Sequence, residues 1–330
     1  MSNVDDEQEF EIEEEILIKY LESKNNIVVI PEGVVAIGEE AFGECGNVVS
    51  VTMPNSVTSI GKMAFYWCRR LNTVNISKAV TEIEGWTFCG CKNLSAVDLP
   101  DGVTSVGKWA FYGCSSLFNI TIPNNVISIG NAAFYGCRSL SSIHIPQGVR
   151  RIGKWTFCEC NRLSKINIPD SVTSVEEKSF SLSGVTSITI PGSVKSIGEK
   201  AFAVCGNLVT VEMADGVVSI EERVFVRCSK LNNVTLSKSI IYIGKLAFGE
   251  CGSLRSIEIP ASVKKIGNKA FYNCSRLESI TISDGIKHLG KDVFGGCRNL
   301  RTVNVRGQIT DIIKEGFAKM EQQIEFVQLK

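Results

Sequence analysis

The sequence predicts an α/β repeat solenoid, in which one short supersecondary unit is copied along an axis. Three observations support this: a phenylalanine, a proline and a cysteine each recur at one position of the repeat. Successive phenylalanines are 23 residues apart, except for one step of 22 residues. They are Phe42, Phe65, Phe88, Phe111, Phe134, Phe157, Phe180, Phe202, Phe225, Phe248, Phe271, Phe294 and Phe317. Such a period marks a repeat architecture, because each unit buries its apolar face against its neighbours.

The first element of each unit is a short strand. In the segment 117–122, apolar residues lie at positions 117, 120 and 122 and two of them are β-branched, as in a strand with one buried face. Pro123 ends this strand, because proline has no N–H for the hydrogen-bond ladder. All eight prolines occupy this position of the repeat. We expect the strands of successive units to stack in parallel, about 4.8 Å apart.

A second extended piece and a turn complete the unit. The segment 126–130 should turn a corner at its glycine, and because Glu84, Glu176 and Glu221 replace that glycine elsewhere, we expect no positive φ there. Residues 132–137 have the pattern of a single helical or 3₁₀ turn. This turn places the phenylalanine ring in the core, where its burial contributes roughly 1.5–3 kcal/mol.

Aligned on its phenylalanine, the unit reads L-x-x-I-x-I-P-x-x-V-x-x-I-G-x-x-A-F-x-x-C-x-x. This pattern resembles the BspA-type leucine-rich repeat family over roughly residues 27–320. The resemblance implies a curved, right-handed leucine-rich-repeat superhelix with a parallel sheet on its concave face. It also implies a non-enzymatic module for adhesion or protein binding, of the surface or secreted kind.

The ends of the chain depart from the repeat. We predict an acidic N-terminal capping helix at 1–26, and one solenoid of about thirteen 23-residue units at 27–330 with a C-terminal cap from about 318. Apolar residues recur at helical spacing among the N-terminal acids, at Phe10, Ile16, Leu17, Tyr20 and Leu21. Such a helix would cover the first coil; the alternative is a detached helix that binds a partner. The segment 324–329 should supply a closing strand.

The unit around Phe180 is irregular. It is one residue short, with Ser183 in place of the cysteine and Glu176 in place of the glycine. We expect a local bend or loosened packing at 176–190. A functional hinge is the alternative interpretation.

Charge and hydropathy exclude several classes of function. The chain has 35 basic and 35 acidic residues, and although residues 1–30 are acidic, the basic residues of the repeats form no single run. We therefore expect no nucleic-acid partner. No apolar stretch approaches the roughly 18–20 residues that span a bilayer. The acidic N-terminus does not resemble a secretory signal, which favours the cytoplasm; a chain whose leader had been removed would be at the cell surface or secreted.

The cysteines predict no chemistry. Eleven of the thirteen lie three residues after a phenylalanine, where a free thiol acts as a small apolar filler, and an odd total fits reduced thiols better than a disulfide framework. The two histidines, His144 and His288, have no nucleophile in register. We predict no catalytic residue, no metal site and no cofactor.

Two positions of the repeat, two residues before and one residue after the phenylalanine, change character along the chain. In the first half they hold an aromatic stripe, at Met63, Tyr66, Trp86, Trp109, Tyr112, Tyr135 and Trp155. In the second half the first of these positions is mostly basic, at Lys178, Lys200, Arg223 and Lys269. If exposed, the stripe would bind a partner or mediate self-association; alternatively, the rings pack flat between coils.

The outward face of the strands is the second candidate surface. Its polar positions include Asp98, Thr121, His144, Asn167, Glu212 and Glu258. The first hypothesis for function is a non-enzymatic scaffold that binds a protein through this concave face or through the aromatic stripe. The alternative is a carbohydrate- or cell-wall-binding adhesin whose exposed tryptophans contact a glycan.

Overall fold

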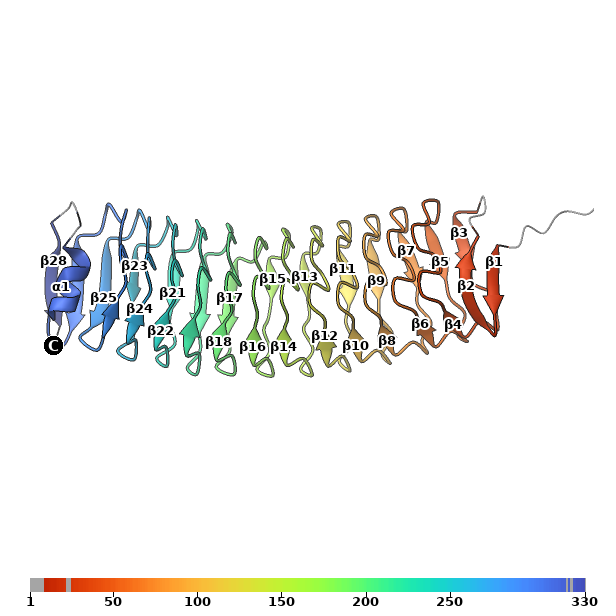
Figure 1. Cartoon of the computed structure of the whole chain (residues 1–330), viewed down its shortest axis with the longest axis horizontal. Coiled ribbons are helices and arrows are strands. Elements are labelled where there is room, and N and C mark those ends of the chain that lie inside the picture. The colour runs from red at the N-terminus through yellow and green to blue at the C-terminus, as the bar shows by residue number, and fades with distance from the viewer. Residues whose placement is uncertain (1–8, 22–24, 319, 321–322, 330) are drawn as a thin grey trace, which may run out of the picture. The chain divides into compact units, whose positions relative to one another are not determined.

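The structure is a computed structural model that describes residues 9–21, 25–318, 320 and 323–329. The chain forms two compact units. The N-terminal unit runs to residue 149 and includes 159–161, and the C-terminal unit comprises 150–158 and the residues from 162 onward. Each unit is a stack of coils with two short strands per coil (Figure 1), which confirms the predicted repeat solenoid.

In the N-terminal unit, the first strands of the coils form a five-stranded parallel sheet in the order β11-β9-β7-β5-β3. These strands are β3 (Ile27–Val29), β5 (Ser50–Thr52), β7 (Thr73–Asn75), β9 (Ala96–Asp98) and β11 (Asn119–Thr121), and β13 (Ser142–Ile143) follows them. Residues at the same position of the repeat face each other, as Ile120 faces Val97. The 23-residue step therefore sets the register of the sheet.

The second extended pieces pair as well, which the sequence analysis did not anticipate. In the N-terminal unit they are β4 (Ala36–Ile37), β6 (Ser59–Ile60), β8 (Glu82–Ile83), β10 (Ser105–Val106) and β12 (Ser128–Ile129). Strands β4 and β6 pair in parallel, and β8, β10 and β12 form a parallel sheet of their own. Each coil is thus held to the next along two of its sides.

The C-terminal unit repeats this arrangement. Its second strands form a seven-stranded parallel sheet: β14 (Arg151–Ile152), β16 (Ser174–Val175), β18 (Ser196–Ile197), β20 (Ser219–Ile220), β22 (Tyr242–Ile243), β24 (Lys265–Ile266) and β26 (His288–Leu289). Its first strands are β15 (Lys165–Ile166), β17 (Ser187–Ile190), β19 (Thr210–Met213), β21 (Asn233–Thr235), β23 (Ser256–Glu258), β25 (Ser279–Ser283) and β27 (Thr302–Arg306).

The phenylalanines form the core of each unit. Twelve of them, from Phe42 to Phe294, are among the largest fully buried side chains, and Phe317 is 4% exposed. Neighbouring rings within a unit stack with centroids 4.6–5.6 Å apart. The predicted hydrophobic column of rings is therefore present in both units.

From Phe42 to Phe294, the turn that carries each phenylalanine is not helical, so that part of the prediction is wrong for these coils. Residues two before and two after the ring have positive φ, as in Trp109 (65°) and Gly113 (71°). A positive φ at the third residue is the signature of a type II turn. The opened turn also bonds to the next coil, where the Phe111 N–H donates to the Ala133 carbonyl at 2.8 Å. This supplies a third line of hydrogen bonds between coils.

The corner glycines do not have positive φ, as expected. They are needed because backbones approach closely at the corner. A Cβ on Gly107 would lie 2.5 Å from the Gly85 nitrogen, and one on Gly61 would lie 2.7 Å from the Glu39 nitrogen. Real Cβ contacts are longer, so glycine lets consecutive coils meet at this point.

The predicted N-terminal helix at 1–26 is wrong over residues 10–20, which form an antiparallel hairpin of β1 (Phe10–Glu13) and β2 (Ile16–Tyr20). Strand β2 pairs in parallel with β4, and its Tyr20 ring stacks on Phe42 at 5.1 Å. A short apolar run fits helix or strand, and here the open edge of β4 favours the strand. The detached helix is excluded for the same reason, while the 26/27 boundary stays a prediction; residues 1–8 and 22–24 lie outside the described part.

The expectation of loosened packing at 176–190 is also wrong. Phe180 stacks on Phe157 at 5.4 Å and on Phe202 at 5.0 Å, and Val185 is fully buried. The Ser183 hydroxyl lies 3.4 Å from the Cys205 sulfur in place of a thiol. Because the missing residue falls in the turn between Ser183 and Val185, the core contacts are kept.

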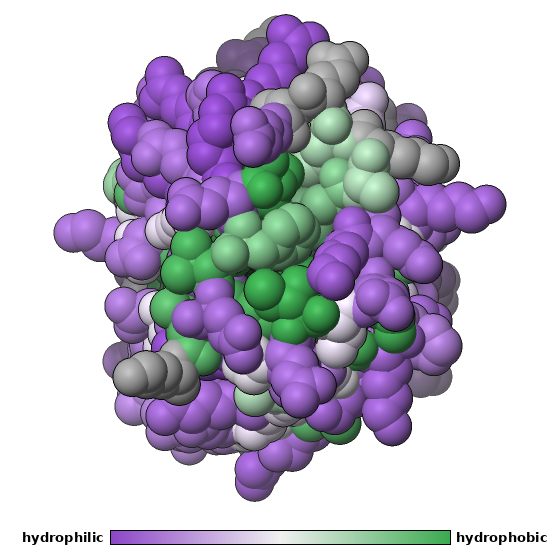
Figure 2. Space-filling view, turned by 90° about the vertical axis from the view of Figure 1, so that its left-hand side faces the viewer, coloured by the Kyte–Doolittle hydropathy of each residue, from purple (hydrophilic) through white to green (hydrophobic). Residues whose placement is uncertain are grey.

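The C-terminal end combines a predicted strand with an unexpected helix. Strand β28 (Glu325–Leu329) pairs in parallel with β27, as predicted for the closing strand. Helix α1 (Asp311–Phe317) replaces the second strand and the turn of the last coil. Seen from this end, apolar residues gather in the middle of the face and hydrophilic residues surround them (Figure 2).

Candidate functional site

The thirteen cysteines are buried free thiols, and they do more than fill space. The Cys114 thiol donates to the Phe88 carbonyl of the preceding coil at 3.1 Å, and the same bond recurs through both units, as at Cys251 with Phe225 at 3.2 Å. Burial raises the pKa of Cys251 from its usual value near 9 to about 12. A protonated, enclosed thiol is a poor nucleophile and a poor metal ligand, so these residues are structural.

The described residues contain no group of three or more His, Cys, Asp or Glu side chains that could hold a metal ion. Among the same residues, no helix has the length and apolar character needed to cross a lipid bilayer.

The aromatic stripe of the N-terminal unit, which we call the aromatic ridge, comprises Met63, Tyr66, Trp86, Trp109, Tyr112 and Tyr135. Its five aromatic residues form one continuous series of ring contacts: Tyr66 to Trp86 at 6.4 Å, Trp86 to Trp109 at 4.1 Å, Trp109 to Tyr112 at 5.4 Å and Tyr112 to Tyr135 at 4.8 Å. All five rings of this series are half-buried. The ridge is therefore between the two expectations: its rings pack on each other, and each keeps part of its surface in solvent.

The structure adds two residues that the sequence analysis missed. Trp67 lies beside Tyr66, with centroids 5.9 Å apart, and the Arg69 guanidinium sits 4.4 Å from the Trp67 centroid. Trp67 lies flat on the next coil because Gly90 has no side chain there; a Cβ on Gly90 would be 2.9 Å from its Cδ1. The sequence contained one indication of this contact: Trp67 stands at a repeat position that holds glycine in the next three coils.

Polar groups border the far end of the ridge. The Tyr135 hydroxyl donates to Glu159 Oε1 at 2.5 Å, and Arg138 pairs with the other oxygen of that carboxylate at 3.0 Å. The Trp109 Nε1 donor is buried and has no hydrogen-bond partner among the described residues, while the Lys108 ammonium lies 5.3 Å from its ring. The ridge thus joins aromatic surface to both charged and unpaired polar groups.

Most of the basic half of the pattern is neutralised in the C-terminal unit. Each of three bases pairs with the glutamate just before it, at 3.6 Å for Lys178–Glu177, 2.7 Å for Lys200–Glu199 and 2.8 Å for Arg223–Glu222. The hydrogen bond from Lys200 lowers the pKa of Glu199. Trp155 belongs to this unit, with the Lys178 ammonium 5.7 Å from its ring. The fourth base, Lys269, lies 5.0 Å from the Tyr272 ring centroid, so three of the four expected basic residues are ion-paired.

The six sheet-face candidates are all exposed. Asp98, Thr121 and His144 belong to the N-terminal unit, where the Thr121 hydroxyl donates to Asp98 Oδ1 at 3.0 Å. The other three, Asn167, Glu212 and Glu258, belong to the C-terminal unit, where Glu258 pairs with Arg306 at 3.0 Å. These six positions are polar and solvated, although β3 exposes Ile27 and Val29 on the same face, and the aromatic residues of the ridge are not among them.

Solved bacterial structures resemble this chain over nearly its whole length. A leucine-rich repeat protein from Bacteroides ovatus ATCC 8483 is 28% identical, with 97% of each chain covered and a TM-score of 0.65. A leucine rich cell surface protein from Faecalibacterium prausnitzii A2-165 is also 28% identical, covering 91% of this chain and 93% of that chain, with a TM-score of 0.54. The pneumococcal vaccine antigen PcpA shares the fold at 18% identity, 97% and 96% coverage and a TM-score of 0.56.

No curated protein matches the sequence. The BspA type leucine rich repeat region matches residues 19–117, 87–209 and 195–323 in six copies, which together include most of the chain. Proteins of this fold are typically non-enzymatic repeat scaffolds. The chain is a member of the BspA-type leucine-rich repeat family.

Proposed function

We propose that the chain is a non-enzymatic, adhesion-type scaffold that binds a protein partner through the aromatic ridge of its N-terminal unit. The supporting observation is the series of half-buried Tyr and Trp rings from Tyr66 to Tyr135. Tyrosine, tryptophan and arginine dominate the energetics of protein interfaces, and Arg69 flanks the ridge. Apolar surface that is continuous over several coils favours an interaction site.

A comparison within the chain favours the ridge over the sheet face. In the C-terminal unit, the position that holds Trp86 and Trp109 is occupied by bases such as Lys200 and Arg223. Each of these two bases pairs with the glutamate just before it, so its charge is already compensated within the chain. The sheet-face candidates are solvated and partly paired. The description of the Faecalibacterium protein as a cell surface protein favours the surface or secreted location over the cytoplasm.

The glycan-binding alternative needs an open tryptophan face. Trp86 and Trp109 lie against each other with centroids 4.1 Å apart and planes tilted by 39°, so each ring covers part of its neighbour. This arrangement suits an anchor for apolar side chains better than a platform for a sugar ring. A glycan array tests the alternative directly.

The decisive variant is Trp86→Ala combined with Trp109→Ala. Alanine is compatible with the positive φ here, because Ala132 has a φ of 54° at the same repeat position. The matched control is Leu246→Ala, at this position in the C-terminal unit, where Leu246 also has a φ of 54°. We expect both proteins to unfold cooperatively.

Partners are identified by crosslinking to the immobilised full chain and mass spectrometry, and each purified partner is then titrated. We expect the dissociation constant to rise at least tenfold for the double variant, as for loss of a hot spot, and to stay unchanged for Leu246→Ala. Equal affinity of the double variant would move the site to the sheet face. Glycan-array binding without a protein partner would replace this proposal with the carbohydrate-binding alternative.

A further inference from the structure

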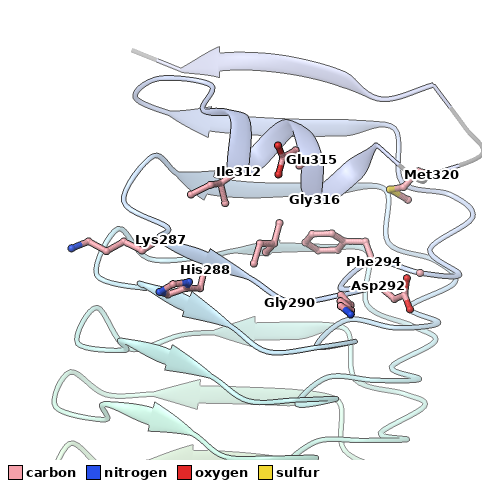
Figure 3. A pocket seen from close by; sticks show the side chains of 12 residues that line it. Lys287, His288, Gly290, Asp292, Phe294, Ile312, Glu315, Gly316 and Met320 are labelled. Atoms are coloured by element: carbon pink, nitrogen blue, oxygen red, sulfur yellow. The ribbon is translucent and has the colours of Figure 1, made fainter.

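A pocket of about 490 Å³ lies between β26 and helix α1 of the C-terminal unit. Leu289, Phe294 and Ile312 give it an apolar wall, and its charged lining residues are Lys287, Lys291, Asp292 and Glu315. Helix α1 lies across the pocket from β26 (Figure 3). The pocket exists because the last coil forms a helix at the place where every earlier coil of the C-terminal unit has its second strand.

Two backbone carbonyls of the pocket lack the partners that their equivalents have. One coil earlier, the Lys264 carbonyl accepts from the Lys287 N–H and the Ile266 carbonyl accepts from the Gly290 N–H, both at 2.9 Å. The equivalent acceptors on the pocket are the Lys287 and Leu289 carbonyls. The described residues donate no hydrogen bond to either.

Two backbone donors are open in the same way. One coil earlier, the Lys269 and Phe271 N–H groups donate to the following coil at 2.9 Å. Their equivalents, the Asp292 and Phe294 N–H groups, have no acceptor within the described part of the chain. The pocket therefore presents two acceptors and two donors in the pattern that the strand, corner and turn of one more coil would satisfy.

One lining residue, Lys291, specifies the occupant further. Lys291 occupies the position after the corner glycine, and at this position neighbouring coils form ion pairs, as in Lys245–Glu222 at 3.2 Å and Lys154–Glu177 at 3.4 Å. Lys291 has no acidic partner among the described residues. An acid at the matching position of an added segment would complete this pattern.

We propose that the pocket binds an extended peptide segment of a partner protein, which adds to β26 as a further parallel strand. In the register of the preceding coils, its first residue donates to the Lys287 carbonyl and its third, aliphatic residue packs beside Leu289 and Ile312. Its fourth residue is a glycine that donates to the Leu289 carbonyl, since corner backbones approach too closely for a side chain. Its fifth residue is acidic and lies beside Lys291.

The probe is the fluorescein-labelled peptide Thr-Ala-Ile-Gly-Glu with a blocked C-terminus, titrated with the full chain and followed by anisotropy. We expect saturable binding with a dissociation constant below about 1 mM. Replacing the glycine amide of the peptide with an ester removes one donor and should weaken binding by about two- to tenfold. Equal affinity of the ester and the amide would overturn the proposed strand register.

Variants of the chain locate the site. The variant Ile312→Trp is designed to fill the pocket; Ile312 is 38% exposed. The control is Ile127→Trp, at a residue of the N-terminal unit that is 64% exposed. We expect Ile312→Trp to abolish peptide binding and Ile127→Trp to leave it unchanged. Lys291→Glu should weaken binding severalfold, and a peptide ending in lysine should restore it.

Three results would overturn the proposal. The first is a peptide titration that does not saturate, and the second is unchanged peptide binding by the Ile312→Trp variant. The third is self-association of the chain that Ile312→Trp abolishes, together with no binding of the peptide. The last result would assign the pocket to a second copy. Because the aromatic ridge belongs to the other unit, Trp86→Ala with Trp109→Ala should leave peptide binding unchanged, so failure here leaves the proposed ridge function testable.

Discussion

Truncation of one ring in the middle of the C-terminal unit should cost far more than truncation at its end. Phe225 is fully buried and stacks on Phe202 at 5.5 Å and on Phe248 at 5.2 Å. Burial and cavity formation together predict a loss of about 3–5 kcal/mol in the free energy of unfolding for Phe225→Ala. Phe225→Leu keeps most of the apolar volume and loses two ring pairs, so we expect about 1–3 kcal/mol.

The matched end variant is Phe317→Ala, since Phe317 is 4% exposed, stacks in parallel on Phe294 at 4.6 Å and meets Phe326 edge-on at 5.8 Å. Urea unfolding followed by circular dichroism measures all three variants, and the slope with urea reports whether each unit still unfolds cooperatively. In a stack with nearest-neighbour coupling, a central loss also separates the coils on either side. Equal losses for Phe225→Ala and Phe317→Ala, or a central loss under about 1 kcal/mol, would refute this reasoning.

Two further predictions follow from the corners and the thiols. Gly107→Ala should lower the free energy of unfolding by about 1–3 kcal/mol, because its Cβ would lie 2.5 Å from the Gly85 nitrogen; unchanged thermal unfolding would contradict this. The pKa of Cys251 is raised to about 12, above its unfolded value near 9, so its contribution is full below pH 9 and falls as pH rises from 9 to 12. Stability should fall by about 1 kcal/mol per pH unit for this thiol, and Cys251→Ala should show a shallower alkaline loss in urea titrations; identical slopes would count against it.

Most of the fold could be predicted because the repeat makes each position report on many coils. The spacing of Phe42 through Phe317 identified the buried column, and the proline position marked the end of the first strand. The glutamates at 84, 176 and 221 correctly indicated that the corner does not need positive φ. These features depend on local pattern and on identical neighbours, which a sequence shows directly.

The errors lie where the neighbour is not another copy of the unit. Residues 10–20 form a hairpin because β4 offers an unpaired edge, and residues 311–317 form a helix after the last paired strand. The turns bend through positive φ at Trp109 and its equivalents because this directs their N–H groups to the next coil. Hydrogen bonds to another coil decided these conformations, and local propensity carries no record of them.

The candidate sites divide in the same way. The sequence alone determined which side chains share a face, including the aromatic positions from Met63 to Tyr135 and the polar sheet face. Only the tertiary structure decided that the bases at 178, 200 and 223 are neutralised by adjacent glutamates, that Trp67 belongs with the ridge, and that β26 ends at a pocket. The periodic pattern specifies position within a coil, whereas side-chain distances and open backbone groups depend on how coils pack and where the stack ends.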